Sequence, residues 1–191
     1  MPRLSKIVTR NGDGGNTGTA DRREIRKSSQ RIETIGAIDE LNSFIGLLRC
    51  ALPPADDRED NDAFLEHTQH VLFNLGGGLA MGDSMLEAEA VADLETEIEA
   101  HNAELPPLKE FILPQGSEAT VRAHVCRTVT RRVERDLVRL IDQEDLPAAV
   151  EALPYINRLS DYFFVLGRNL ARVSGGVETE WAKPARAAPG H

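Results

Sequence analysis

Five stretches of this sequence repeat apolar residues at helical spacing, and Pro or Gly residues separate most of them. In the first stretch, which begins at Arg31, they recur at steps of three and four: Ile32, Ile35, Ile38, Leu41, Phe44, Ile45 and Leu48. Further helices are predicted over about 62–80, 87–103, 118–142 and 153–173. No convincing series of strands accompanies them. This pattern predicts an all-α fold, a five-helix antiparallel bundle.

The helical region has a different character from the two ends of the chain. Residues 1–30 are polar, basic and rich in Gly, with little apolar periodicity, and they are predicted to form an ordered or mobile loop region. Residues 31–176 hold the five helices. Residues 177–191 form a C-terminal tail, and its Pro- and Ala-rich part, WAKPARAAPGH (181–191), is expected to be frayed or disordered at its end. We expect one domain, because 191 residues suffice for one self-sufficient core.

Charge and cysteine content narrow the classes of protein. A net charge of -9 argues against general nucleic-acid binding, although a few Arg residues can still form a local site for a small anion. No apolar run approaches the about 18 residues of a membrane span, and no signal-peptide core opens the sequence. Cys50 and Cys126 are far apart and are expected to be small buried residues of a reducing compartment. These features favour a cytoplasmic protein with no membrane partner.

Positive charge is concentrated in the fourth predicted helix, in the run CRTVTRRVERD (126–136). At about 100° per residue, Arg127, Arg131 and Glu134 share one side of this helix. An apolar stripe is expected on the other side: Val121, Val125, Val129, Val133, Leu137 and Leu140. The charged side is either a solvated face with ion pairs along the helix or a site for an anion. Clustered Arg, where Lys would serve a surface equally well, favours the anion.

Polar residues in three other helices leave similar alternatives open. The first helix has a stripe that faces either solvent or a subunit interface or ligand: Asp39, Asn42, Ser43 and Gly46. Asn157 and Asp161 share a face of the fifth helix, where they form either a buried amide–acid pair or part of a site. His67 and His70 lie one turn apart, but no second Glu-x-x-His pair supports a di-iron bundle, so no metal ligand is assigned.

The N-terminal region carries a glycine-rich motif, TRNGDGGNT (9–17). Consecutive glycines allow backbone N–H groups to turn toward an anion and cradle a phosphate. Thr9 and Thr17 add hydroxyl groups, and Arg10 and Lys27 add positive charge. The motif is neither a P-loop nor a dinucleotide fingerprint. It predicts either a phosphate-binding loop or a flexible arm.

Together these segments resemble the PduO-type ATP:cob(I)alamin adenosyltransferases, also called cobalamin or corrinoid adenosyltransferases. The matching stretches follow the family order: TRNGDGGNT, the Lys27 region with RIETIGAIDELNS (31–43), FILPQGS (111–117), CRTVTRRVER (126–135) and INRLSDYFF (156–164). The resemblance implies a homotrimer with active sites between subunits. It also implies that cob(I)alamin attacks C5′ of ATP, giving adenosylcobalamin and triphosphate.

The resemblance also assigns roles to residues. Arg131 would contact the polyphosphate, and Arg127 would pair with Asp39 of a neighbouring subunit. Phe111, with Ile112 beside it, would stand at the lower face of the corrin ring. The ATP-binding set would be Thr9, Arg10, Gly12, Gly14, Gly15, Thr17, Lys27, Arg131, Glu134 and Asn157. Mg²⁺ would be held through ATP, with no protein metal ligand assigned.

One position departs from the family pattern, and the functional alternatives stay open. Gln115 stands where relatives usually have the first of two glycines, so a side chain there would restrict a positive φ or narrow the corrin pocket. A flavin-type reductase and an adenosylcobalamin-dependent enzyme are the expected partners. A protein that delivers adenosylcobalamin with little turnover, or a helical bundle that only forms interactions, are the alternative functions.

Overall fold

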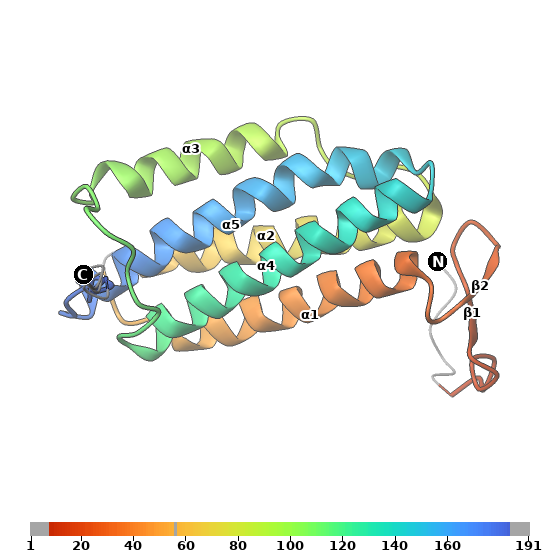
Figure 1. Cartoon of the computed structure of the whole chain (residues 1–191), viewed down its shortest axis with the longest axis horizontal. Helices are drawn as coiled ribbons and strands as arrows, with labels where there is room; N and C mark the ends of the chain where they lie inside the picture. Colours follow the sequence, from red (N-terminus) through yellow and green to blue (C-terminus); the bar gives the residue numbers. More distant parts are fainter. Residues whose placement is uncertain (1–7, 56, 184–191) are drawn as a thin grey trace, which may run out of the picture.

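The protein is an elongated helical bundle with a small β-hairpin at one end (Figure 1). The computed structural model describes residues 8–55 and 57–183. Its five helices confirm the predicted number: α1 (Gln30–Ala51), α2 (Arg58–Met81), α3 (Ala90–Ala103), α4 (Glu118–Gln143) and α5 (Pro147–Val173). Helix α4 packs between α1 and α5, while α2 covers α1 and α3 covers α5.

The bundle is not antiparallel throughout. Consecutive helices reverse direction, and α4 therefore runs opposite to both α1 and α5 (Figure 1). Helix α3 packs on α5 rather than on α4, its successor in the chain. Because α3 and α5 are each antiparallel to α4, they run in the same direction. The connection of residues 104–117 is long enough to carry the chain from α3, packed on α5, to the start of α4.

Side-chain caps and glycines explain where several helices begin and end. Ser29 accepts a hydrogen bond from Ile32 N at 3.4 Å at the start of α1, and Ser117 accepts one from Thr120 N at 3.2 Å at the start of α4. Gly82 ends α2 in the left-handed conformation, with φ 82°. Residues at or next to each boundary therefore determine where these helices begin or end.

Helix α5 begins about two turns earlier than predicted. The predicted start, at about residue 153, lies next to Pro154, and proline lacks the N–H group that a helix interior uses. In the structure Pro154 lies inside α5, and Pro147 occupies the first turn, where its missing N–H group costs nothing. The intervening residues include three alanines, which favour a helix. Their burial anchors the extra turns: Ala148, Ala149 and Ala152.

The N-terminal region contains strands that the prediction missed. Strands β1 (Asn16–Gly18) and β2 (Glu24–Arg26) pair antiparallel, with Thr17 opposite Ile25. Each strand has only three residues, too few for an alternating pattern to stand out. Residues 16–30 are consequently an ordered hairpin and its connection to α1.

The apolar stripe of α4 is also placed differently. Val133, Leu137 and Leu140 are buried as predicted, but Val121 is 37% exposed and Val125 and Val129 are only partly buried. Repeated steps of four drift about 40° each around a helix, so the valines leave the core side. Steps of three and four keep the buried stripe in line: Ala119, Ala123, Cys126, Thr130, Val133, Leu137 and Leu140.

The two cysteines differ in burial, and one prediction about them is wrong. Cys126 is fully buried in the core, as predicted, whereas Cys50 is exposed near the end of α1. Both thiols are free.

None of the helices described here is long and apolar enough to cross a membrane.

Candidate functional site

The charged side of α4 contains an arginine that forms no ion pair with any residue that the structure describes. Arg127 is half-buried, and its guanidinium lies 5.9 Å from the ring centre of Phe164 on α5. Its Nε is buried and has no hydrogen-bond partner among the described residues. Burial, together with the nearby charge of Arg131, lowers the pKa of Arg127. The side chain is thus partly desolvated without the carboxylate that usually accompanies such a charge.

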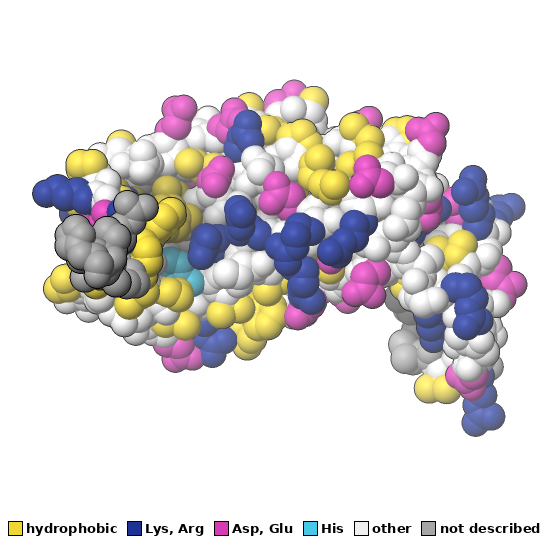
Figure 2. Space-filling view, viewed as in Figure 1, with side chains coloured by type: hydrophobic (Ala, Val, Ile, Leu, Met, Phe, Trp, Pro, Cys, Tyr) yellow, Lys and Arg dark blue, Asp and Glu magenta, His cyan; other side chains and the backbone are white. Residues whose placement is uncertain are grey.

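Arg131 and Glu134 follow on the same side of α4. Arg131 is exposed and forms no ion pair with any described residue. Glu134 accepts a hydrogen bond from Asn157 Nδ2 at 2.7 Å, which ties α4 to α5. Figure 2 shows Lys and Arg side chains gathered over α4 in the middle of this face. The surface therefore offers positive charge, and the carboxylate of Glu134 is oriented by an amide.

Asn157 does not form the predicted pair with Asp161. Its Oδ1 accepts from Arg158 Nη1 at 2.6 Å, and its Nδ2 is used by Glu134. Asn157 and Asp161 are one turn apart on α5, but the α4 carboxylate is the closer partner in this packing. The amide consequently belongs to the α4–α5 contact.

The polar stripe of α1 separates into a buried and an exposed part. Asn42 is buried, and it exchanges hydrogen bonds of 3.1 Å and 3.0 Å with Gln69 of α2. Asp39 and Ser43 are exposed. No described residue forms an ion pair with Asp39, although its neighbour Glu40 pairs with Arg132. Asp39 and Arg127 are therefore both available to a second molecule.

The glycine loop, defined as residues 9–15, folds against the end of β2. Arg10 and Gly15 adopt positive φ angles of 62° and 81°. Lys27 N donates to Gly15 O at 2.9 Å, and a methyl group placed on Gly12 would lie 2.7 Å from Lys27 Nζ. A side chain at position 12 would therefore displace the end of the flexible lysine from its place over the loop. Around Gly14 there is open space, so packing does not require glycine there.

A hollow of about 400 Å³ lies beside this loop. Three of the predicted phosphate-binding residues line it, namely Thr9, Gly12 and Thr17, together with Arg22 and Arg23 from the turn of the hairpin. Hydroxyl groups, a glycine backbone and two guanidinium groups suit a polyphosphate. The hollow thus brings together both threonines and one glycine of the motif, beside two arginines and the carboxylate of Glu24.

The predicted corrin-facing residues lie at the other end of the bundle. Phe111 is 79% exposed and lines a hollow of about 370 Å³ with Phe164. Ile112 pairs with Glu180 in an isolated antiparallel bridge, and Trp181 N donates to Phe111 O at 2.6 Å. The aromatic rings of two distant segments therefore share one apolar recess.

Gln115 does not adopt the positive φ that its position suggested. Gly116 takes the unusual conformation instead, with φ 130°. The Gln115 side-chain amide donates to the Thr179 hydroxyl, which directs it toward the C-terminal segment. Gln115 is thus accommodated without backbone strain.

The prediction missed two features at or beside this recess. Phe164 lies in a motif that was recognised, but no role was assigned to it. The C-terminal strap, defined as residues 177–183, was assigned to the tail without a structural role, yet it runs along residues 111–113. Arg168 holds it through an ion pair with Glu178, with Nε to Oε1 at 2.6 Å. In the sequence, the signal that this segment is ordered was limited to an acid and an aromatic residue, Glu178 and Trp181, beside the Pro- and Ala-rich end of the chain.

These features are spread along the molecule. The hairpin stands off the end where α1 begins, and residues 104–117 lie at the opposite end, with α4 between them (Figure 1). One chain therefore does not bring the glycine loop, Arg131 and Phe111 together. In the described part of the chain, no group of three or more His, Cys, Asp or Glu side chains is placed to hold a metal ion.

Comparison with known proteins identifies the family. The family described as cobalamin adenosyltransferase matches residues 7–170. The chain is 50% identical to a cobalamin adenosyltransferase of Cupriavidus metallidurans, over 95% of this chain and 96% of that one. It is 45% identical to a corrinoid adenosyltransferase of Bacillus subtilis, over 94% of each.

Solved structures agree with this assignment. A variant PduO-type ATP:corrinoid adenosyltransferase from Lactobacillus reuteri, complexed with cobalamin and ATP, superposes with a TM-score of 0.84. It is 31% identical and covers 93% of this chain and 100% of its own. The sequence match and the shared fold both extend over nearly the whole chain, and the chain therefore belongs to the cobalamin adenosyltransferase family.

Proposed function

We infer that this protein transfers the 5′-deoxyadenosyl group of ATP to the cobalt of cob(I)alamin, giving adenosylcobalamin and triphosphate. The observation that carries this inference is the set of unpaired cations on α4, Arg127 and Arg131, in a chain that belongs to this family over most of its length. In the reaction the Co(I) electron pair forms the cobalt–carbon bond while the C5′–oxygen bond breaks. Both electrons of the broken bond leave with the triphosphate.

The nucleotide half of the site is proposed to combine the hairpin with α4 and α5. The glycine loop contributes backbone N–H groups to the phosphates, Lys27 contributes its ammonium, and Arg131 stabilises the charge that develops on the leaving triphosphate. Glu134 and Asn157, already hydrogen-bonded at 2.7 Å, orient the nucleotide. The full set is Thr9, Arg10, Gly12, Gly14, Gly15, Thr17, Lys27, Arg131, Glu134 and Asn157. Mg²⁺ would be bound mainly through the phosphate oxygens.

The corrinoid half is proposed to be the recess at Phe111. The exposed ring of Phe111 would cover the lower face of the corrin and displace the lower axial ligand, and Ile112 and Phe164 would extend the apolar wall. An apolar recess also keeps water away from the reactive Co(I). Catalysis here requires alignment and charge stabilisation, because cobalt itself is the nucleophile.

We propose that a homotrimer completes the site. Arg127 has no carboxylate partner in residues 8–55 and 57–183, and Asp39 is exposed on α1, so a contact between subunits would pair them. Such a contact would also bring a glycine loop to the α4 surface of a neighbour, which a single chain does not do. Residues 1–30 would then serve as the nucleotide-binding region of a bundle formed by residues 31–176, with residues 177–191 as its tail.

The function is tested by an optical assay. The protein is mixed with MgATP and anaerobically reduced cob(I)alamin, and loss of the Co(I) spectrum is followed together with the appearance of a light-sensitive alkylcobalamin. We expect product that depends on the protein. Arg131→Ala should lower kcat/KM for ATP at least tenfold, which corresponds to about 1.4 kcal/mol of lost transition-state stabilisation.

Arg122→Ala is the matched control for this variant. Arg122 is nine residues away on α4, about 180° around the helix, and it already pairs with Glu118 at 2.5 Å. Its kcat/KM should stay near the original value. Binding of both substrates without turnover would instead favour delivery of adenosylcobalamin to a partner enzyme. Failure to bind either would leave a bundle that only forms interactions.

A further inference from the structure

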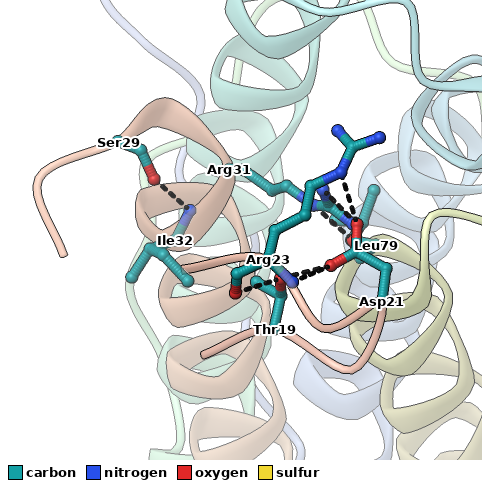
Figure 3. A network of polar contacts seen from close by, with 7 residues as sticks. All are labelled: Thr19, Asp21, Arg23, Ser29, Arg31, Ile32 and Leu79. Carbon is teal, nitrogen blue, oxygen red and sulfur yellow. Dashed lines mark hydrogen bonds and ion pairs between the residues drawn. The ribbon is translucent and has the colours of Figure 1, made fainter. Parts of the chain in front are cut away.

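A buried ion pair at the base of the hairpin joins it to the helices. Arg31, the second residue of α1, is only 2% exposed. Its Nε donates to Leu79 O at 2.6 Å, and its Nη1 contacts Asp21 Oδ2 at 3.0 Å. Figure 3 shows Arg31 reaching from α1 to both partners, one on α2 and one on the hairpin. One guanidinium therefore connects three segments of the chain.

Asp21 organises the turn of the hairpin, defined as residues 19–23. Its carboxylate accepts from the Thr19 hydroxyl and from Arg23 N at 3.3 Å, and it pairs with Arg23 Nε at 3.5 Å (Figure 3). The backbone of Asp21 donates to Ala80 O at 3.3 Å. The Thr19 hydrogen bond comes first among the interactions that hold the pKa of Asp21 below its ordinary value of 3.8. The carboxylate is consequently ionised at neutral pH.

Gly82 lies beside this pair at the end of α2. A methyl group placed there would lie at ordinary contact distance from both side chains, 3.6 Å from Arg31 Nη2 and 3.7 Å from Asp21 Oδ2. Its φ of 82° is the reason that glycine is favoured here. The turn that ends α2 therefore lies in contact with both members of the pair.

The glycine loop has no comparable attachment. Its backbone hydrogen bonds, from Asp13 N to Arg10 O, from Gly15 N to Gly12 O and from Lys27 N to Gly15 O, stay within residues 9–27. The side-chain contacts of Arg26 also end inside the hairpin, on Gly14 O and Asn16 Oδ1. Within the described residues, the polar contacts of the hairpin with the helices are therefore those of Asp21. In Figure 1 the rest of the hairpin projects away from the bundle.

We propose that Asp21 and Arg31 are positioning residues for the nucleotide. The pair fixes the turn of the hairpin to the ends of α1 and α2, and the paired strands transmit that position to the glycine loop. Neither residue is needed as a contact to ATP in this arrangement. The proposal rests on the proposed function, because it assumes that the glycine loop binds the polyphosphate.

The test compares Asp21→Asn with Asp62→Asn. Asp21→Asn preserves the size of the side chain and removes the charge that holds Arg31. Asp62 forms a part-buried ion pair with Arg49 at 2.8 Å, which joins the opposite ends of the same two helices, so Asp62→Asn is a control for general destabilisation. For each protein, kcat and KM are measured for MgATP and for cob(I)alamin, and hydrogen exchange is followed in residues 9–27.

For Asp21→Asn we expect KM for ATP to rise at least fivefold, with kcat at saturating ATP and KM for cob(I)alamin within twofold of the original values. Exchange in the hairpin should become faster. Asp62→Asn should leave both KM values and the hairpin exchange unchanged. If Asp21→Asn does not fold, Arg31→Lys carries the same expectation, because one ammonium cannot reach Leu79 O and Asp21 together in the geometry of the guanidinium.

An unchanged KM for ATP in a folded variant would overturn the proposal, as would equal losses for ATP and cob(I)alamin. A failure of the proposed function looks different. In that case the original protein would itself show no ATP-dependent alkylation of cob(I)alamin, and no comparison of variants would be needed.

Discussion

Replacing Glu178 by Gln should release the C-terminal strap from the loop that carries Phe111. Arg168, which is 4% exposed, donates to Glu178 through Nε at 2.6 Å and through Nη2 at 3.0 Å. The same Nη2 donates to Pro106 O at 2.9 Å. The strap in turn contacts the loop through Leu113 N to Thr179 O at 2.9 Å and through Trp181 N to Phe111 O at 2.6 Å. Removing one charge therefore weakens the attachment of the whole strap.

The magnitude follows from the burial of the two partners. Removing one member of a fully buried ion pair costs about 3–5 kcal/mol, and a hydrogen bond to a charged group contributes about 1.5–3 kcal/mol. Glu178 keeps 19% exposure, so water partly replaces the lost carboxylate. We expect a loss of about 2–3 kcal/mol in the free energy of unfolding. For a chain of this length that corresponds to a decrease in Tm of roughly 5–10 °C.

Trp181 makes the local effect measurable. It is the single tryptophan of the sequence, it lies in the strap and it is 40% exposed. In Glu178→Gln its fluorescence should shift to longer wavelength, and acrylamide should quench it more efficiently. Thermal unfolding followed by circular dichroism gives Tm from the helices independently.

Lys183→Gln is the control on the same strap. Lys183 pairs with Glu110 at 2.7 Å, but the two side chains are 62% and 35% exposed, so this pair contributes at most about 1 kcal/mol. We expect little change in Tm or in quenching. If Glu178→Gln behaved like Lys183→Gln in both measurements, the argument from burial would be wrong.

Three further predictions concern the site and the thiols. Phe111→Ala should damage the reaction that starts from Co(II) with a reductase and spare the reaction of chemically reduced cob(I)alamin; equal loss in the two assays would contradict a role at the lower face of the corrin. Arg127→Asp should weaken the trimer in sedimentation velocity, and adding Asp39→Arg should restore it. A double variant that stays dissociated would show that Arg127 and Asp39 do not pair between subunits. Burial raises the pKa of Cys126 to about 12, so iodoacetamide at pH 8 should modify only the exposed Cys50 in the folded protein and both thiols after unfolding. Modification of both thiols in the folded protein would show that Cys126 is accessible.

The helices were predictable because their signals are local. Spacing of apolar residues identified all five, and breakers set most of their ends. The start of α5 was predicted about six residues too late, and Pro154 lies inside the helix although proline is usual only in a first turn. The hairpin was missed because strands of three residues carry almost no periodic signal. Its position depends instead on Arg31 and Asp21, which meet only after the helices have packed.

Site residues were predictable one by one, but their mutual arrangement was not. The motifs placed Arg131 and Glu134 on one side of α4 and Lys27 beside the glycine loop, as the structure has them. Asn157 and Asp161 were expected to share a face of α5, either as a buried amide–acid pair or as part of a site, and Asn157 Nδ2 donates to Glu134 on another helix. The contact of the strap with Phe111 joins segments about 70 positions apart, which no local pattern reveals. Long-range packing thus decides which polar groups meet.

Arg31 and Arg168 each attach a segment outside the helices to the bundle, at opposite ends of it. These buried arginines each pair with the acid of a segment outside the helices and also donate to a backbone carbonyl, at Leu79 and Pro106 respectively. A guanidinium makes both contacts because its donors diverge in a fixed fork, whereas the single ammonium of lysine reaches only one of the two acceptors. One arginine therefore holds the hairpin with the glycine loop, and the other holds the strap beside Phe111. Since the rigid helices separate the two anchors, Arg31→Lys should impair mainly the use of ATP and Arg168→Lys mainly the use of the corrinoid.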